Sequence, residues 1–255
     1  MRDVAATAFT MLEFSACLVA CTPPMGLMHL LDKGDPTQRR AGRWMRRLGR
    51  LSSSLTPLWR FHVEGQPPAD VKTRPYVCVS NHESNADPFL LSHLPWDMRW
   101  VAKRELYKMP LVGITFRVSG DIPLTRGDGD SVRAMFAECR RALDAGISVM
   151  IFPEGTRSKT GELLPFRDGA FKLAIEAGVP ILPMAIAGTR NCLLREAPYL
   201  GRADAVVKVL SPIPTTGLGP EDLAALRDKT RQTISAALKP LRAQVGATLF
   251  ESTPA

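Results

Sequence analysis

Cysteine is scarce in this chain, and its placement excludes two common uses of the residue. The 255 residues contain five cysteines, with no C-x-x-C pair and no cysteine–histidine spacing that suits a metal site. Cys17 and Cys21 are four residues apart but lie in an apolar stretch. We therefore interpret all five as free thiols of a protein in a reducing compartment, and we expect no bound metal.

The chain also lacks the motifs that supply a nucleophile from the protein itself. It has no G-x-S-x-G turn, and no cysteine stands in an evidently electropositive turn. Any general base in this chain is therefore expected to activate a substrate hydroxyl, which implies transfer of a group to that hydroxyl.

Acidic residues are outnumbered by basic ones. The chain has 33 Lys and Arg against 25 Asp and Glu, a formal net charge of +8. Such an excess implies an anionic partner, which is nucleic acid, a membrane surface or an acidic substrate. A recognisable nucleic-acid module and an interleaving of basic and aromatic residues are both missing, so we expect no nucleic-acid partner.

The N-terminal region is almost wholly apolar, with Glu13 the only charge between Val4 and Ala20. It does not look like a secretory signal, because Arg2 is offset by Asp3, and the run is short for a membrane-spanning helix. Pro23-Pro24 interrupts it before the apolar pattern resumes. We expect two short apolar helices that dip into one leaflet of a membrane, and a buried core helix is the alternative.

The next segment, QRRAGRWMRRLGRL at 38–51, has the pattern of a basic amphipathic helix. On a helix, its apolar residues fall on one side and its arginines take the rest; the apolar residues are Ala41, Trp44, Met45, Leu48 and Leu51. This pattern suits the plane of an anionic bilayer, although an ordinary solvated surface helix would also show it. We expect residues 1–58 to attach the protein to the cytoplasmic face of the inner (plasma) membrane.

The remainder, residues 59–255, alternates between short apolar runs and helical patterns. Strands are expected at Tyr76–Ser80, Arg99–Ala102, Asp121–Leu124, Ser148–Phe152, Ile181–Ile186 and Val206–Leu210. Helices are expected at Pro88–Leu94, Leu111–Val118, Ser131–Ala145, Gly169–Ala177 and Pro220–Leu238. Crossovers of this length predict an α/β catalytic domain with a mostly parallel mixed sheet flanked by helices, preceded by the N-terminal helical hairpin.

One connection is unusually long. The sixteen residues PEGTRSKTGELLPFRD, between Phe152 and Gly169, have no strong periodicity and are rich in charge, Gly and Pro. Loops of that length in a compact domain are usually functional or disordered. This loop leaves the end of a buried strand, which is where ligands bind in open α/β sheets.

His82 and Asp87 lie in a short polar gap between two apolar runs. Asp87-Pro88 has the pattern of a helix N-cap followed by its first residue, so the intervening turn can bring the carboxylate to the imidazole. An imidazole held by a carboxylate through one nitrogen has the other free to act as a general base. The alternative is a capping aspartate and an unrelated surface histidine. His29, His62 and His93 have no comparable partner in the sequence.

Three basic residues follow strands whose ends would lie at the same edge of a parallel sheet. Lys103, Arg126 and Arg157 would project there together with His82. Convergent Arg and Lys side chains bind phosphate, and Gly155 would allow a close approach of backbone to a ligand. Each of these residues taken alone is more often a solvated surface charge.

Four segments of the chain resemble the conserved blocks of the glycerophospholipid acyltransferases, especially the bacterial 1-acyl-sn-glycerol-3-phosphate acyltransferases. The blocks occur in the family's order as NHESNAD at 81–87, GDIPLTR at 120–126, FPEGTRS at 152–158 and VPILP at 179–183. KREL at 103–106 and FRDGAFKLAIEAGVPILP at 166–183 are also similar to the family, and the similarity covers about residues 60 to 210.

The resemblance implies an enzyme that transfers a fatty acyl group to the free hydroxyl of a lysophospholipid. The donor is acyl-CoA or acyl carrier protein, the first acceptor to consider is 1-acyl-sn-glycerol-3-phosphate, which gives phosphatidic acid, and no metal or other cofactor is required. By resemblance the catalytic residues are His82, the base, and Asp87, which orients it. The substrate-binding residues are Lys103, Arg126, Glu154, Gly155, Thr156 and Arg157, with the two arginines on the acceptor's phosphate and Glu154 and Gly155 at its glycerol.

Other functions stay open at this point. Pro123 and Leu124 stand where the family often has a bulkier apolar residue, so another lysophospholipid or a lyso-ornithine-type lipid is an alternative acceptor. A lipid hydrolase would use water in place of the acceptor. A peripheral protein that only binds anionic lipid would use the basic helix and apolar N-terminus, but it would have no need of a positioned base.

Overall fold

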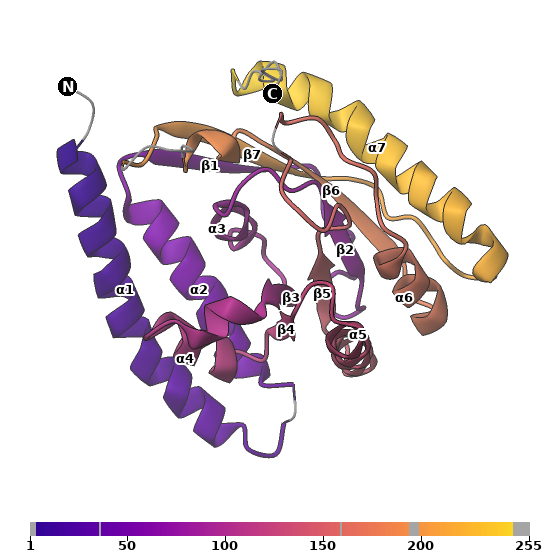
Figure 1. Cartoon of the computed structure of the whole chain (residues 1–255), viewed down its shortest axis with the longest axis horizontal. Coiled ribbons are helices and arrows are strands. Elements are labelled where there is room, and N and C mark those ends of the chain that lie inside the picture. The colour runs from indigo at the N-terminus through magenta and orange to yellow at the C-terminus, as the bar shows by residue number, and fades with distance from the viewer. Residues whose placement is uncertain (1–3, 36, 159, 194–198, 247–255) are drawn as a thin grey trace.

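The computed structural model describes residues 4–35, 37–158, 160–193 and 199–246 (Figure 1). The α-helices are α1 (Val4–Leu31), α2 (Arg39–Leu55), α3 (Asp87–Leu91), α4 (Val112–Val118), α5 (Gly129–Asp144), α6 (Gly169–Ala177) and α7 (Leu223–Gln244). The strands are β1 (Trp59–Glu64), β2 (Val77–Ser80), β3 (Met98–Lys103), β4 (Ile122–Leu124), β5 (Ser148–Ile151), β6 (Ile181–Ala187) and β7 (Ala203–Val209). Short 3-10 helices are η1 (Arg104–Lys108), η2 (Thr189–Asn191) and η3 (Pro220–Asp222).

The strands form one sheet in the order β1-β7-β6-β2-β5-β3-β4. All neighbouring strands are parallel except β6 and β7, which are antiparallel. This confirms the expected α/β fold with a mostly parallel mixed sheet. The expected strands and helices from residue 76 onward all occur, with ends shifted by a few residues.

Strand β1 was not expected from the sequence. Its six residues, WRFHVE, include two charged side chains and a histidine, so they lack the apolar run that marked the other strands. The strand lies at the edge of the sheet, where it pairs with β7 alone. An edge strand with polar side chains buries little, and its sequence signal is correspondingly weak.

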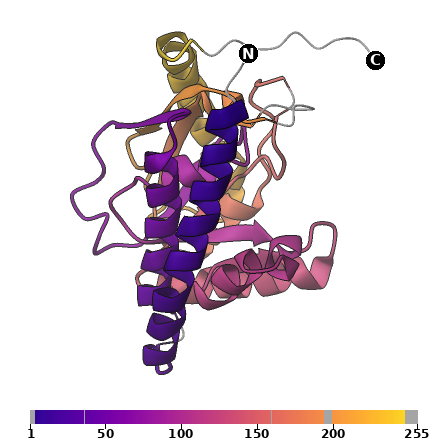
Figure 2. The same cartoon turned by 90° about the vertical axis from the view of Figure 1, so that its left-hand side faces the viewer.

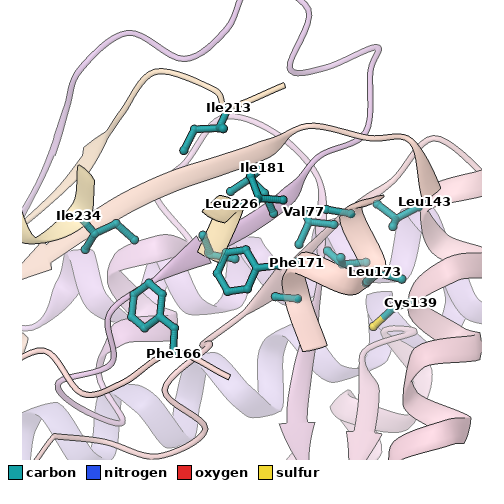
Figure 3. Close-up of a cluster of buried hydrophobic side chains, with 14 of the residues drawn as sticks. Val77, Cys139, Leu143, Phe166, Phe171, Leu173, Ile181, Ile213, Leu226 and Ile234 are labelled. Carbon is teal, nitrogen blue, oxygen red and sulfur yellow. The ribbon is translucent and has the colours of Figure 1, made fainter. Parts of the chain in front are cut away.

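Helices cover both faces of the sheet (Figure 1). Val77 and Val79 of β2 belong to the core shared with α5, α6 and α7, whereas Cys78 between them belongs to the core shared with α3. This alternation is the period of two that a strand requires when both its faces are buried. Figure 3 shows the first core, in which Phe171 of α6 and Ile234 of α7 lie against the sheet residues.

Helix α1 differs from the two short helices expected at the N-terminus. It runs unbroken for 28 residues with Pro23 and Pro24 inside it. A proline inside a helix costs about 3 kcal/mol or more, because it removes a backbone hydrogen bond and crowds the preceding turn. Packing on both sides of the prolines opposes this cost: Cys17, Cys21 and Met25 are buried against α2. The hairpin is therefore made by α1 and α2, which lie side by side in Figure 2.

Three polar side chains of α1 face the protein, while Ser15 is exposed. Thr7, Thr10 and Glu13 are buried, and the Thr10 hydroxyl lies 2.7 Å from the Thr56 hydroxyl at the end of α2. The outward side is apolar, with exposed Val4, Phe9, Met11, Leu12, Val19, Leu27, Leu30 and Leu31. Among the described residues, α1 is the helix whose length and apolar composition would allow it to cross a membrane.

Helix α2 packs part of its apolar stripe against α1. Ala41 and Leu48 are buried in the α1–α2 contact, while Leu51 is exposed. The expectation that every arginine of this helix faces outward is wrong for Arg46, which forms an ion pair of 2.8 Å with the buried Asp121. Its guanidinium lies 4.5 Å from the centre of the Trp100 ring, and burial lowers the pKa of Arg46 to about 10.

Candidate active site

The parallel pairing of β2 and β5 places the histidine turn beside the FPEGTRS segment. Val79 pairs with Ile151, so His82 and Glu154, each three residues further along, reach the same edge of the sheet. The His82 amide donates to Glu154 Oε1 at 2.7 Å, and the Ser158 amide donates to the His82 carbonyl at 3.0 Å. Two motifs that are 72 residues apart in the chain are thus joined by backbone contacts.

His82 and Asp87 meet, as their spacing predicts. Nδ1 of His82 lies 2.6 Å from Oδ2 of Asp87, whose side chain is fully buried. A carboxylate can only accept a hydrogen bond, so Nδ1 carries the proton. Nε2 makes no hydrogen bond to any of the described residues, and it is therefore free to take a proton from a substrate.

The sequence predicted that Asp87 caps helix α3, and this prediction is wrong. Asp87 is the first residue of α3, whose N-cap Ala86 makes no side-chain bond. Oδ2 of Asp87 instead accepts the Glu83 and Ser84 amides at 2.9 and 3.1 Å. Because the carboxylate binds two amides of the preceding turn, it curls that turn and brings His82 to the same oxygen.

An aromatic side chain packs against one face of the His82 imidazole. The Phe152 ring stacks on the His82 imidazole with ring centres 4.0 Å apart and planes 17° from parallel. Phe152 is itself packed against the core on the α3 side of the sheet. The imidazole is therefore fixed in plane by a ring on its face as well as by Asp87 at its edge.

Sequence reasoning missed two residues that hold this turn from behind. The Asn81 side chain donates to the Ile186 carbonyl at 2.9 Å and accepts the Ile186 amide at 2.8 Å, which ties the end of β2 to β6. The Thr189 hydroxyl donates to Asp87 Oδ1 at 2.5 Å. The first could have been found from its place beside His82, but the second carries no local signal, because it is 102 residues from its partner.

Glu154 is buried against the turn that carries His82. Besides the His82 amide, its other oxygen accepts the Leu164 amide at 2.9 Å. Burial raises the pKa of Glu154, and the two amide hydrogen bonds oppose that rise. Both oxygens are thus occupied by the chain, so the carboxylate holds the long loop to the turn, while its contact with a substrate glycerol stays a prediction.

Three arginines gather at the strand ends. The pKa of Arg126 is lowered, first by burial and then by the positive charges of Arg167 and Arg157. In the described part of the chain, none of the three forms an ion pair with a carboxylate. The Glu105 carboxylate opposes this lowering of the Arg126 pKa. Three like charges brought together favour a bound anion, and Arg167 adds to the two arginines predicted from the sequence.

Gly155 allows the loop to approach one of these arginines. Its φ of +69° is in the left-handed region, and a Cβ there would lie 2.7 Å from Arg167 Nε. A larger residue would displace the guanidinium as well as strain the backbone. The predicted close approach therefore involves Arg167, and approach of a substrate to Gly155 stays a prediction.

Lys103 and Thr156 are both exposed in segments that reach the same edge of the sheet. Lys103 ends β3, where it pairs with Leu124 at the end of β4, two residues before Arg126. The neighbouring Arg104 donates to Thr125 at 3.1 Å and so joins the two strand ends. The structure thus gives Lys103 the predicted position, and its role toward a substrate stays a prediction.

Helix α7 holds the far side of the long loop. Arg231 donates to the carbonyls of Leu163 and Leu164 at 2.8 and 3.2 Å, and Arg227 forms an ion pair of 2.7 Å with Asp168. These contacts were not predicted, because the arginines of α7 lie 59 to 68 residues further along the chain than their partners. They explain how sixteen residues without periodicity keep a defined path.

A third arginine of α7 reaches the turn that carries His82. Arg242 donates to the Gly161 carbonyl and, at 3.2 Å, to Glu83 Oε1. Glu83 directly follows His82, and only 5% of its side chain is exposed. Burial, the largest cause, and the nearby Asp87 carboxylate raise the pKa of Glu83 to about 7.

The remaining histidines differ from His82 in their surroundings. His62 lies 2.9 Å from Asp204, a partner that the sequence did not reveal, but both side chains are about half exposed. His93 Nε2 lies 2.9 Å from the Ser53 hydroxyl, and burial lowers the pKa of His93 to about 4. Neither belongs to the cluster of arginines around the FPEGTRS loop.

The cysteines and the possible metal ligands of the described residues bear on two expectations from the sequence. All five cysteines are free and buried, which confirms the interpretation as free thiols. Within the described ranges, no three His, Cys, Asp or Glu side chains are grouped so that they could hold a metal ion.

The family model and the curated relatives that match this chain point to the same family. The family model described as Acyltransferase matches residues 60–187, just over half of the chain. The human 1-acyl-sn-glycerol-3-phosphate acyltransferase alpha is 36% identical over 164 residues, which cover 64% of this chain and 58% of the relative. The chloroplastic 1-acyl-sn-glycerol-3-phosphate acyltransferase BAT2 of Brassica napus is 33% identical over 179 residues, with 68% and 52% covered. The match thus extends over little more than half the length of these relatives.

A solved structure supports the fold over nearly the whole chain. The crystal structure of the 1-acyl-sn-glycerophosphate acyltransferase PlsC from Thermotoga maritima superposes with a TM-score of 0.75 at 24% identity, covering 95% of this chain and 98% of that one. With the family match and the four sequence blocks in place around His82, the chain belongs to the acyltransferase family that includes the 1-acyl-sn-glycerol-3-phosphate acyltransferases.

Proposed function

We propose that this protein transfers a fatty acyl group from an acyl thioester to the free hydroxyl of a lysophospholipid. The observation that carries the proposal is the state of His82. Its Nδ1 is bonded to a buried carboxylate and its Nε2 has no partner among the described residues. This base is backed by the same loop that carries Arg157, one of three clustered arginines.

The proposed reaction begins with proton transfer to His82. Nε2 takes the proton of the acceptor hydroxyl while the oxygen forms a bond to the thioester carbonyl carbon. The C–S bond then breaks, and the sulfur of the donor leaves with the proton that His82 returns. The products are an ester and a free thiol, and the imidazole ends neutral as it began. Asp87 keeps Nδ1–H in place and stabilises the imidazolium between the two proton transfers.

The acceptor we propose is 1-acyl-sn-glycerol-3-phosphate, which gives phosphatidic acid. A terminal phosphate carries more charge than a phosphodiester and suits Arg126, Arg157 and Arg167, which form no ion pair with a carboxylate in the described part of the chain. Related proteins carry this acceptor in their names. Pro123 and Leu124 lie half-buried just before Arg126, so another lysophospholipid is the alternative that a substrate panel decides.

We place the reaction at the cytoplasmic face of a membrane. Helix α1 presents a largely apolar outer side, and Thr7, Thr10 and Glu13 are turned inward. The free cysteines fit a reducing compartment. Acyl-CoA and acyl carrier protein are both available to such a site as donors.

The proposal is tested by acyl transfer from labelled acyl-CoA and acyl carrier protein to a panel of lysophospholipids. We expect product with at least one donor, and His82→Ala should lower the rate by about 10²- to 10⁴-fold, because the general base is lost. The matched control is His62→Ala, which removes a histidine that also pairs with an aspartate but at an exposed site.

Equal loss in the two variants would contradict the role of His82. If the wild-type protein binds anionic vesicles but acylates no acceptor with either donor, the enzymatic proposal is wrong and a lipid-binding protein is the better account. Release of free fatty acid without an acylated acceptor would indicate a hydrolase.

A further inference from the structure

Thr189 is held in a fixed position at the end of β6. It follows Gly188, whose φ is +94° and where an added Cβ would lie 2.2 Å from the Asp204 carbonyl oxygen of β7. Glycine is therefore required at this turn, and the turn directs Thr189 toward the catalytic strand end. The Thr189 side chain is fully buried.

The hydroxyl of Thr189 completes the set of donors around the Asp87 carboxylate. Oδ2 accepts from His82 Nδ1 and from the Glu83 and Ser84 amides. Oδ1 accepts from Thr189 alone among the described residues. Each oxygen thus has a distinct role, and the Thr189 hydroxyl fixes the one that faces away from the base.

We propose that Thr189 is a positioning residue that sets the orientation of the Asp87 carboxylate and, through it, the orientation of the His82 imidazole. The proposal rests on the proposed acyl transfer for its kinetic part. An O–H···O⁻ bond is among the stronger hydrogen bonds in proteins, and a buried carboxylate oxygen left without a donor is unfavourable. Loss of this bond would let the carboxylate rotate in order to find another donor, which loosens its hold on Nδ1.

Thr189 contacts Asp87 from the end of β6, whereas His82 follows β2. Asn81 ties the end of β2 to Ile186, three residues before Thr189. Hydrogen bonds therefore link the turn that carries His82 to Asp87 and Thr189, and so connect β2, α3 and the end of β6. A residue with this role is expected to act on the chemical step and not on substrate affinity, because it touches neither substrate.

The experiment compares Thr189→Val with Thr189→Ser. Valine has the shape of threonine without the hydroxyl, whereas serine keeps the hydroxyl. We expect Thr189→Val to lower kcat by about 10- to 100-fold with KM little changed, by analogy with the loss of hydrogen-bond partners that orient metal-binding histidines and carboxylates. Thr189→Ser should recover most of the wild-type kcat.

The matched control is Thr230→Val in α7. Thr230 is also fully buried, and its hydroxyl donates to the Leu226 carbonyl within its own helix. Thr230→Val should change the melting temperature without changing kcat. If Thr189→Val and Thr230→Val lower the melting temperature equally and both keep wild-type kcat, Thr189 is structural only and the proposal is wrong.

A second measurement does not depend on activity. The Nδ1 proton of His82, bonded to Asp87, should give a downfield proton NMR resonance that disappears in His82→Gln. We expect this resonance to shift or broaden in Thr189→Val and to return in Thr189→Ser. An unchanged resonance in Thr189→Val would overturn the proposal even if the wild-type protein proves to have no acyltransferase activity, which by itself would overturn only the proposed function.

Discussion

At the scale of single residues, Glu83 is a buried acid that directly follows His82. The surroundings of Glu83 determine whether its carboxyl group is charged. Burial and Asp87 raise its pKa to about 7, against the opposing effect of Arg242 and Arg190. The folded state therefore holds this proton more tightly than the unfolded chain does. The resulting stability is fully present below the unfolded pKa and is lost as the pH rises through the folded one.

Glu83→Gln should remove this pH dependence. Between pH 5 and pH 8 the free energy of unfolding of the wild type should fall relative to that of the variant by on the order of 2 kcal/mol, because glutamine stays neutral. Denaturant titrations at several pH values measure the difference. Glu176→Gln is the control, since Glu176 is exposed beside Lys172 and its loss should leave the pH trend unchanged. A constant difference between wild type and Glu83→Gln across this range would refute the prediction.

The residues of the site divide into those that a local pattern predicts and those that only the fold brings in. His82 and Asp87 are five residues apart, so the expected turn between them was enough to pair them, although Asp87 does not cap the helix. Thr189 and Arg242 are 102 and 159 residues from their partners, and a hydroxyl or guanidinium gives no sign in the sequence of where it will point. Such contacts depend on strand order, which the sequence did not give.

At the scale of elements, α7 acts as a support for the long loop. Arg231 binds two successive carbonyls of the segment that also carries Glu154 and Arg157. Arg231→Met should keep the buried alkyl contacts but release those carbonyls. We expect KM for the lysophospholipid to rise by about 3- to 10-fold, which corresponds to roughly 1 kcal/mol of lost positioning.

Hydrogen exchange of the peptides that cover residues 153–168 measures the loosening directly. Lys239→Met is the control, because Lys239 is an exposed residue of the same helix. If Arg231→Met leaves both exchange and KM unchanged, α7 does not support the loop in the way the contacts indicate.

The elements show where sequence patterns succeed and where packing overrides them. Buried strands and α6 were predicted closely, because their apolar runs or helical periods are bounded by turn residues. The break expected at Pro23-Pro24 did not occur, since burial of Cys17, Cys21 and Met25 against α2 sustains one helix. The edge strand β1 was missed for a different reason. It forms because it pairs with β7, and its own sequence lacks an apolar strand pattern.

At the scale of the whole molecule, the outer side of α1 should determine membrane attachment. Leu12 and Val19 are 71% and 58% exposed there. Replacing them together by Leu12→Gln and Val19→Thr should weaken binding to vesicles about tenfold or more, because each buried apolar side chain contributes about 1.5–3 kcal/mol. Vesicle sedimentation at fixed lipid concentration measures the change.

Val63→Thr is the control for that experiment. Val63 is also an exposed apolar residue, at 40%, but it lies on the edge strand β1 and not on α1. Equal binding of the α1 variant and the wild type would show that α1 is not the attachment surface. Loss of binding in Val63→Thr as well would indicate a general effect of apolar surface and would count against the same assignment.

The ion pair between Arg46 and Asp121 has a practical consequence for anyone who wishes to shorten this protein. A version that begins at Trp59 would retain all four motifs and yet lose α2, whose Arg46 pairs with Asp121. It would also uncover Trp59, which now meets Phe14 of α1 edge to face, and Phe89, which stacks on Phe14. A form that can be handled without detergent is therefore better sought by repolarising the outward side of α1 than by cutting the chain before β1.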